Sequence, residues 1–463
     1  MEMSMSVCRE HRWLLLAVCA AQFFMPFMMA GVNAVLPAIS LSLDASAREL
    51  GLIGAFYALG LAVFQLAGGL WGDIWGRRRI FLVGLAIFSL SGALLGFVEN
   101  MTLFLFLRLV QGLGGALYSA SSLALLASAA PPSMRASYIG LSSSAVYSGI
   151  ACGPPVAGFV ADWFGWRWLF WGNAIAGGLA LCIMLLRVRL EWRTAEGASF
   201  DWSGCVLYAL AMTCLTFGAS HIGDAPVWGM LLLAGFLALL GLFCFKELRT
   251  AMPMLDLKML RRCRVISLSL LAAFINYASF FGLLFFVSIY LQTGRGFSAR
   301  EAGLFLALQS LVQAAATPLT ARLCRRWPLG RIAAAGILLC GMGLLITAFL
   351  TLETPLWLLA LAQALVGAGV AVFVLPNTAI ILEKAGDAAV GRASGLIGAV
   401  RTGGQLSNMV IITVTLALVL GHQPVSRETL DGFMTALHWD LLLFGLFNLA
   451  AMGCALCRDR AGE

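Results

Sequence analysis

The residues of this chain best able to take part in chemistry are a few charged and polar side chains set inside long apolar segments. Arg108 lies about six residues into the apolar segment 102–126, or roughly 9 Å along a helix. An ionised side chain at that depth in an apolar surrounding is costly without partners, so Arg108 is a candidate functional residue, together with Gln111. The alternative is a structural arginine held by Gln111 and by backbone carbonyls.

Other ionisable residues lie in or near comparable segments. Arg401 falls within segment 393–420, whereas no Asp or Glu falls at the middle of any segment, and the nearest acids, Glu301 and Asp440, stand near segment ends. The apolar interior is therefore predicted to carry net positive charge. The twelve cysteines show no disulfide or zinc spacing, and no metal or cofactor is expected.

The composition determines which solvent surrounds these residues. Hydrophobic residues make up 61% of the 463 residues and charged residues 11%, against roughly 25% charged in an average globular chain. Such a chain has too little polar surface for water, which excludes a soluble enzyme. The net charge of +8 comes from short basic clusters between apolar segments, a pattern typical of membrane topology signals and not of nucleic-acid binding.

Hydropathy predicts fourteen membrane spans arranged as six, two and six. The predicted spans are 13–38, 50–71, 80–98, 102–126, 138–160, 168–186, 203–220, 228–245, 265–291, 301–321, 332–350, 356–376, 393–420 and 435–457. The first is too long for a signal peptide and is expected to be retained. We expect a six-helix bundle over 1–190, a two-helix hairpin with basic linkers over 191–264, and a second six-helix bundle over 265–463.

The basic residues predict the orientation of these spans. Cytoplasmic loops hold an excess of Lys and Arg. With both termini in the cytoplasm, 23 of the 30 Lys and Arg residues fall on the cytoplasmic side. The other seven fall on the external side of the membrane or inside a span: Arg48, Arg108, Arg167, Arg295, Arg300, Arg401 and Arg427. Removing the central hairpin would keep this parity, so the hairpin rests on hydropathy alone.

A loop after the second span carries the first recognisable motif. Residues 69–79 read GLWGDIWGRRR, which resembles the GxxxDxxGRR signature of the major facilitator superfamily. Asp73 at a helix C-terminus opposes the helix dipole and needs a cationic partner, and Gly76 permits the tight turn. Contacts that form in one state and break in another would make the loop a gate; the alternative is an ordinary basic loop. The candidate gating residues are Gly69, Asp73, Gly76, Arg77 and Arg78.

The fifth span carries a second, more discriminating motif. It resembles the antiporter signature of the same superfamily in the spacing of its small residues and proline, which are Gly140, Gly149, Gly153, Pro154, Ala157 and Gly158. Glycines on one face let another helix approach closely, and proline bends the helix. The motif predicts a packed, bent helix between the two halves that closes one side of a cavity. The candidate gating residues here are Gly149, Gly153, Pro154 and Gly158.

Further motifs extend the resemblance over nearly the whole chain. The fourth span reads RLVQGLGGA over 108–116, similar to the RxxQGxG signature, and shorter matches such as WRWLF at 166–170 and GRASG at 391–395 follow in family order. The chain thus resembles the fourteen-span drug:proton antiporter branch. That resemblance implies an all-helical, monomeric secondary transporter in the cytoplasmic membrane. Such a transporter exports a small organic compound by alternating access in exchange for protons.

Two alternatives stay open. One is a proton-independent or anion-preferring facilitator, and the other is a membrane sensor that keeps the fold without transport. No ATP-binding loop or catalytic constellation is present in the sequence, so neither a pump ATPase nor another enzyme is expected. The candidate residues of transport and coupling are Arg108, Gln111, Arg401, Glu301 and Asp440.

One departure from the branch concerns the first span. Its members read like LDxTIVNVALP, whereas this chain has Met28 in place of the acid. This puts in question both the proton-binding carboxylate and a preference for cations. Two aromatic runs, at 23–27 and 277–286, are expected to border the cavity, the alternative being lipid contact or helix packing. The candidate cavity residues are Phe27, Met28, Asn33, Asn276, Tyr277 and Phe280.

The hairpin makes a testable prediction about topology. Reporter tags at residues 195 and 255 should both report from the cytoplasm, and a tag at Asp224 should report from outside, because 203–220 and 228–245 would each cross the membrane. Fusion-reporter assays measure this directly. A cytoplasmic signal at Asp224 would leave twelve spans and contradict membership of the fourteen-span branch.

Overall fold

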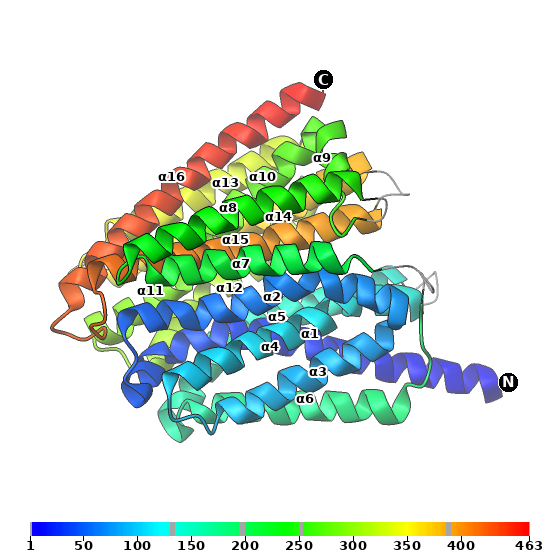
Figure 1. Cartoon of the computed structure of the whole chain (residues 1–463), viewed down its shortest axis with the longest axis horizontal. Coiled ribbons are helices and arrows are strands. Elements are labelled where there is room, and N and C mark those ends of the chain that lie inside the picture. Colours follow the sequence, from blue (N-terminus) through cyan, green and yellow to red (C-terminus); the bar gives the residue numbers. More distant parts are fainter. Residues whose placement is uncertain (1, 130–134, 194–199, 251–252, 386–389, 463) are drawn as a thin grey trace.

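The computed structural model describes residues 2–129, 135–193, 200–250, 253–385 and 390–462, and within these ranges it is helical without strands (Figure 1). The first half comprises α1 (Glu2–Leu43), α2 (Ala47–Trp75), α3 (Arg77–Leu95), α4 (Met101–Ala129), α5 (Arg135–Phe164) and α6 (Arg167–Arg187). The hairpin is α7 (Trp202–His221) and α8 (Pro226–Arg249). The second half comprises α9 (Leu257–Arg262), α10 (Arg264–Phe280), α11 (Leu283–Ile289), the π-helix η1 (Tyr290–Gly294), α12 (Ala299–Leu323), α13 (Leu329–Ala348), α14 (Leu356–Ala385), α15 (Val390–Val419) and α16 (Leu430–Gly462).

The helices confirm the predicted number of spans. Fourteen helical stretches in the described ranges are long and apolar enough to cross a membrane. Backbone polar groups cannot remain unpaired in hydrocarbon, and a helix satisfies them internally, which is why the apolar segments fold this way. Both termini lie at one end of the molecule, and there α6 and α16 diverge (Figure 1). We call this the terminal end and the opposite one the distal end.

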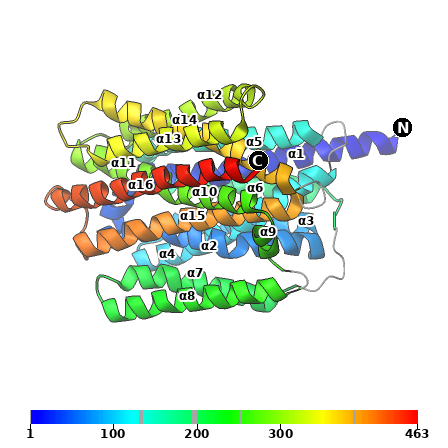
Figure 2. The same ribbon diagram turned by 90° about the horizontal axis from the view of Figure 1, so that it is seen from above.

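The hairpin packs on the outside of the molecule, across the junction of the two halves. Helix α7 contacts α2 of the first half and α15 of the second, while α8 lies beyond α7 (Figure 2). Only Gly229, Phe243 and Glu247 are buried in α8. The remaining apolar surface of α8 is therefore available to lipid.

Charged contacts fix the hairpin at both ends. At the distal end, Asp224 between α7 and α8 forms an ion pair with Arg48 at the start of α2. The Nε2 atom of His422, which follows α15, lies 2.8 Å from the other Asp224 oxygen. At the terminal end, Lys246 of α8 pairs with Asp201, which caps α7. The tip of the hairpin thus connects the two halves.

Two matching capping boxes start the second span of each half. Ser46 and Glu49 cap α2, and Ser298 and Glu301 cap α12, in each case with the serine side chain and the glutamate carboxylate bonded to the partner's backbone N–H. Such boxes satisfy the free N–H groups of a helix start. The carboxylate of Glu301 is exposed and bonded to Ser298. Glu301 therefore caps the start of α12 and does not lie within the span.

The predicted span 265–291 is a single span with a break. Helix α10 ends at Phe280, and α11 continues after Phe281 and Gly282. Asn408 of α15 donates Nδ2 hydrogen bonds to the carbonyls of Ala278 (2.7 Å) and Ser279 (3.3 Å). A side chain from a neighbouring helix thereby satisfies carbonyls beside the break, as irregular backbone in a membrane requires.

Candidate functional site

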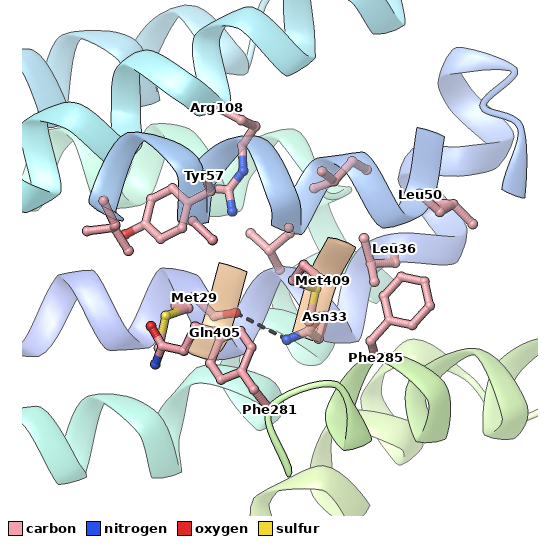
Figure 3. A pocket seen from close by; sticks show the side chains of 15 residues that line it. Met29, Asn33, Leu36, Leu50, Tyr57, Arg108, Phe281, Phe285, Gln405 and Met409 are labelled. Carbon is pink, nitrogen blue, oxygen red and sulfur yellow. Dashed lines mark hydrogen bonds between the residues drawn. The ribbon is translucent and has the colours of Figure 1, made fainter. Parts of the chain in front are cut away.

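A pocket lies between the two halves of the molecule (Figure 3). Its walls come from α1, α2 and α4 of the first half and from the α10–α11 span and α15 of the second. The lining residues are Met29, Val32, Asn33, Leu36, Leu50, Ile53, Gly54, Tyr57, Ala58, Leu61, Arg108, Phe281, Phe285, Gln405 and Met409. Among the described residues, no group of three or more His, Cys, Asp or Glu is arranged to hold a metal ion.

Arg108 is the charged residue of this pocket. It is 2% exposed and lies seven residues after the start of α4, or about 10 Å along the helix. Its Nη1 donates to Gln111 Oε1 at 2.6 Å, and the guanidinium carbon stands 4.3 Å from the ring centroid of Tyr57. A hydrogen bond and a cation–π contact stabilise the charge in part, although neither partner carries a negative charge.

Close contact between two helix backbones brings Tyr57 under Arg108. A Cβ on Gly112 would lie 2.2 Å from the carbonyl oxygen of Tyr57, and one on Gly60 would lie 2.3 Å from that of Leu109. Only glycine fits at such a crossing, where small residues let membrane helices pack. The glycine of the RxxQGxG motif thus positions the arginine of the same motif. No sequence signal identified Tyr57, because its role depends on this crossing.

The predicted cavity residues of the first span need correction. Asn33 lines the pocket, but Phe27 and Met28 do not, and Met28 is fully buried. The face of α1 that meets the pocket carries Met29, Val32, Asn33 and Leu36, which are spaced as one side of a helix. Position 28 therefore lies outside the lining of this pocket.

The predicted residues of the ninth span also lie elsewhere. Asn276 is fully buried and donates to Asn448 of α16 at 3.2 Å, so this amide finds its partner within the second half and not in a cavity. Tyr277 and Phe280 are half-buried and outside the pocket, whereas Phe281 and Phe285 line it. Phe281 lies in the break after α10, and Phe285 lies in α11.

Neither Gln111 nor Arg401 lines the pocket. Gln111 is fully buried, and its amide nitrogen lies near Gly92 of α3, inside the first half. Gln111 accepts the hydrogen bond of Arg108 on the side away from the pocket lining. Arg401 of α15 lies within electrostatic range of Tyr147 of α5 and Tyr277 of α10, and so stands between the two halves.

Asp440 differs most from its prediction. Helix α16 begins at Leu430, so Asp440 lies ten residues, or about 15 Å, along it, and is 1% exposed. This corrects the statement that every acid stands near a span end. Its Oδ1 accepts a hydrogen bond from Thr415 of α15 at 2.6 Å, and its Oδ2 has no partner among the described residues.

The loop after α2 forms a compact ionic contact at the terminal end. Arg77 donates two hydrogen bonds to Asp73, from Nε at 2.9 Å and from Nη2 at 2.7 Å, and one to the Ala124 carbonyl of α4 at 3.1 Å. Gly76 has a φ of +118°, a conformation that favours glycine. The contact thus ties α2, α3 and α4 of the first half together.

Backbone N–H groups of the same motif form hydrogen bonds with the segment that follows α6. The Arg78 N–H donates to Glu191 at 2.8 Å, and the Arg77 N–H donates to the Trp192 carbonyl at 2.9 Å. A Cβ on Gly76 would lie 2.6 Å from the Glu191 carboxyl carbon, whereas one on Gly69 would meet nothing within 4 Å. Gly76 is therefore required by packing, and Gly69 is not.

The glycines of the antiporter motif divide between two contacts. A Cβ on Gly149 would lie 2.2 Å from the Phe23 carbonyl oxygen, and one on Gly153 would lie 2.7 Å from that of Phe27, so both pack α5 on α1 within the first half. A Cβ on Gly158 would lie 2.2 Å from the Ala299 carbonyl oxygen of α12, in the second half. Pro154 faces Gly303 of α12 in the same crossing.

Other contacts join the halves at the distal end. Gln292 of η1 donates to the Ala34 carbonyl of α1 at 2.9 Å, and the Ala47 N–H donates to the Gln423 carbonyl at 3.0 Å. A Cβ on Gly51 of α2 would lie 2.7 Å from the Thr413 hydroxyl of α15. We call these contacts, with Gly158 on Ala299, the distal seal.

Comparison with known families decides the class. The sequence profile of the Major Facilitator Superfamily matches residues 18–406 and, in an overlapping second match, 269–459. The chain belongs to the major facilitator superfamily. It is therefore a membrane transporter by family, consistent with the pocket between two helical halves.

Several similar proteins are named as exporters or resistance proteins. The chain is 32% identical to the tetracenomycin C resistance and export protein of Streptomyces glaucescens, over 81% of this chain and 70% of that one. It is 30% identical to the multidrug resistance protein Stp of Mycobacterium tuberculosis, over 83% and 72%. The fold matches the transporter PepTSo with a TM-score of 0.72 at 15% identity, covering 98% of both chains.

The loop contact makes a prediction about transport by this facilitator. Asp73→Asn should leave the protein folded and inserted but lower transport several-fold, because the change keeps the side-chain shape while removing the charge that Arg77 holds. Flux per inserted molecule is the measurement. Glu99→Gln, an exposed acid between α3 and α4, is the matched control. Undiminished flux in Asp73→Asn would show that the loop serves topology alone.

The distal seal makes a second prediction. Gly158→Ala should cost about 1–3 kcal/mol, because the new methyl group overlaps the Ala299 carbonyl, and it should lower transport by holding α5 and α12 apart. Gly140→Ala in the same helix is the control, since a Cβ there meets nothing within 4 Å. Thermal unfolding in detergent and flux in liposomes measure both effects. Identical behaviour of the two variants would contradict the assigned packing.

Proposed function

We propose that this facilitator is a secondary active exporter that carries a small organic compound by alternating access in exchange for protons. The observation that carries the proposal is a pocket between the halves, with a buried cation on one wall and a distal seal beyond it. Transporters of this kind hold substrate near the membrane midplane and open to one side at a time. The named roles of its relatives, tetracenomycin C export and multidrug resistance, support export of an organic molecule.

We infer the orientation of the protein in the membrane from the distribution of charge. The positive-inside rule assigns the terminal end to the cytoplasm, so the distal seal would close the outer side in this state. Substrate would enter from the cytoplasm while the seal is closed and leave when it opens. We infer a monomer in the cytoplasmic membrane with both termini inside, organised as 1–190, 191–264 and 265–463.

Asp440 is the proposed proton carrier. A carboxylate buried in a span marks a proton pathway by default, and Asp440 has one oxygen bonded to Thr415 and one without a partner among the described residues. Thr415 belongs to α15, which also carries Gln405 and Met409 in the pocket and Thr413 in the distal seal. A change of charge at Asp440 would therefore act on the helix shared by pocket and seal.

Two alternatives remain as outcomes of the test. A facilitator without proton coupling is favoured by Met28, which stands where related transporters carry an acid. A membrane sensor with the same fold would move no substrate. Flux into liposomes with and without a proton gradient separates these alternatives from a proton-coupled exporter.

The proton site makes a prediction for purified protein in liposomes, with tetracenomycin C as the first compound assayed. Asp440→Asn should abolish accumulation driven by a proton gradient while sparing downhill exchange, because asparagine cannot bind and release the proton. Asp431→Asn is the matched control, since this acid lies on the same helix and is exposed. Proton-driven accumulation that persists in Asp440→Asn would refute the assignment.

A further inference from the structure

The charge of Arg108 has no acidic partner in the pocket. No Asp or Glu is among the lining residues. The partners of the guanidinium in the described structure are the Gln111 amide oxygen and the Tyr57 ring, both uncharged, and Nε is buried without a hydrogen bond. A buried cation without a counter-charge is strongly destabilised, and a ligand that brings a negative charge would relieve this.

The shape of the pocket indicates what carries that negative charge. Arg108 and Tyr57 stand on one side, and Phe281 and Phe285 stand on the other (Figure 3). Facing aromatic side chains favour a flat apolar body between them, with ring contacts worth about 0.5–1.5 kcal/mol each. Apolar side chains such as Met29 and Met409 complete the walls, and sulfur side chains adapt to varied ring systems.

Two neutral amides supply the remaining polarity. Asn33 donates its Nδ2 to the Met29 carbonyl at 3.2 Å, which leaves its amide oxygen as an acceptor. Gln405 belongs to the second half and faces the same pocket. Neither amide favours a cation by charge, so Arg108 decides the charge preference of the pocket.

We infer that this pocket binds its substrate as an organic anion: a planar aromatic acid whose carboxylate or phenolate pairs with Arg108 while its rings lie between Tyr57 and Phe281. The inference rests on the proposed transport function and names its substrate class. A cationic aromatic compound of the same size is excluded from the pocket by the charge of Arg108.

The test uses three probes with one ring system and different charge: 1-naphthoate, 1-naphthamide and 1-naphthylmethylammonium. Binding to the purified full-length protein in detergent is measured by thermal stabilisation over a concentration series. We expect naphthoate to bind at least about tenfold more tightly than naphthamide, and naphthylmethylammonium to bind most weakly. This comparison needs no variant, so it does not depend on the folding of a mutant. Tightest binding of the cation would overturn the inference.

Variants then assign the preference to this pocket. Arg108→Gln should remove the preference for naphthoate, and Arg108→Lys should keep it at reduced affinity, because an ammonium lacks the planar guanidinium fork. Arg331→Gln, an exposed arginine on α13, is the control for loss of a positive charge. A preference that survives in folded Arg108→Gln would place the anion site elsewhere and refute the inference.

A second variant keeps the test decisive if Arg108→Gln fails to fold. Gln405→Glu adds a carboxylate to the pocket with almost no change in shape, and should weaken naphthoate binding about tenfold or more relative to naphthamide. Asn100→Asp, at an exposed position between α3 and α4, is its control. Equal effects of the two substitutions would contradict the inference.

Flux separates failure of this inference from failure of the proposed function. Naphthoate that binds as expected but is not carried into liposomes would count against transport and leave the anion site standing. Carriage of naphthylmethylammonium in preference to naphthoate would preserve transport and reject the anion site.

Discussion

The backbones of α2 and α4 touch at Gly60 and Gly112, and the position of the buried charge depends on that contact. Lipid tails are as apolar as the side chains of a helix, so exchanging lipid contacts for helix contacts brings no hydrophobic gain. Helices in a membrane therefore associate through close van der Waals contact and through hydrogen bonds between them. The pair Gly60 and Gly112 provides the close van der Waals contact between α2 and α4. It sets the Arg108 guanidinium over the ring of Tyr57 and at the edge of the pocket.

The same physical rule shapes the boundary between the halves. Gly158 on Ala299 and Gly51 on Thr413 are backbone or near-backbone approaches at the distal end. Contacts of this kind have little side-chain interlocking to break, which suits the opening and closing proposed for this boundary. Gly149 and Gly153 instead hold α5 to α1 within one half, so one motif contributes both to a stable bundle and to a separable seal.

Buried polar side chains divide into neutral and ionisable ones. Asn408 and Asn276 are neutral amides that each donate a hydrogen bond within the second half. Arg108 lacks an opposite charge in the pocket, and Asp440 has an oxygen without a partner in the described chain. Groups of the second kind are costly in a low dielectric, and their cost falls when a ligand or a proton arrives. The proposed function assigns the substrate to Arg108 and the proton to Asp440 for this reason.

The sequence by itself determined the fourteen spans, the family and the depth of Arg108, because each follows from local hydropathy or from short motifs along one chain segment. It did not determine which face of a span meets the pocket. Met29 lines the pocket and Met28 does not, and Tyr57 pairs with Arg108 from another helix. Helix rotation, helix starts and the crossings set by glycine pairs decided these placements. All three arise from packing between segments far apart in the chain, where one residue of rotation changes which side chain meets the pocket.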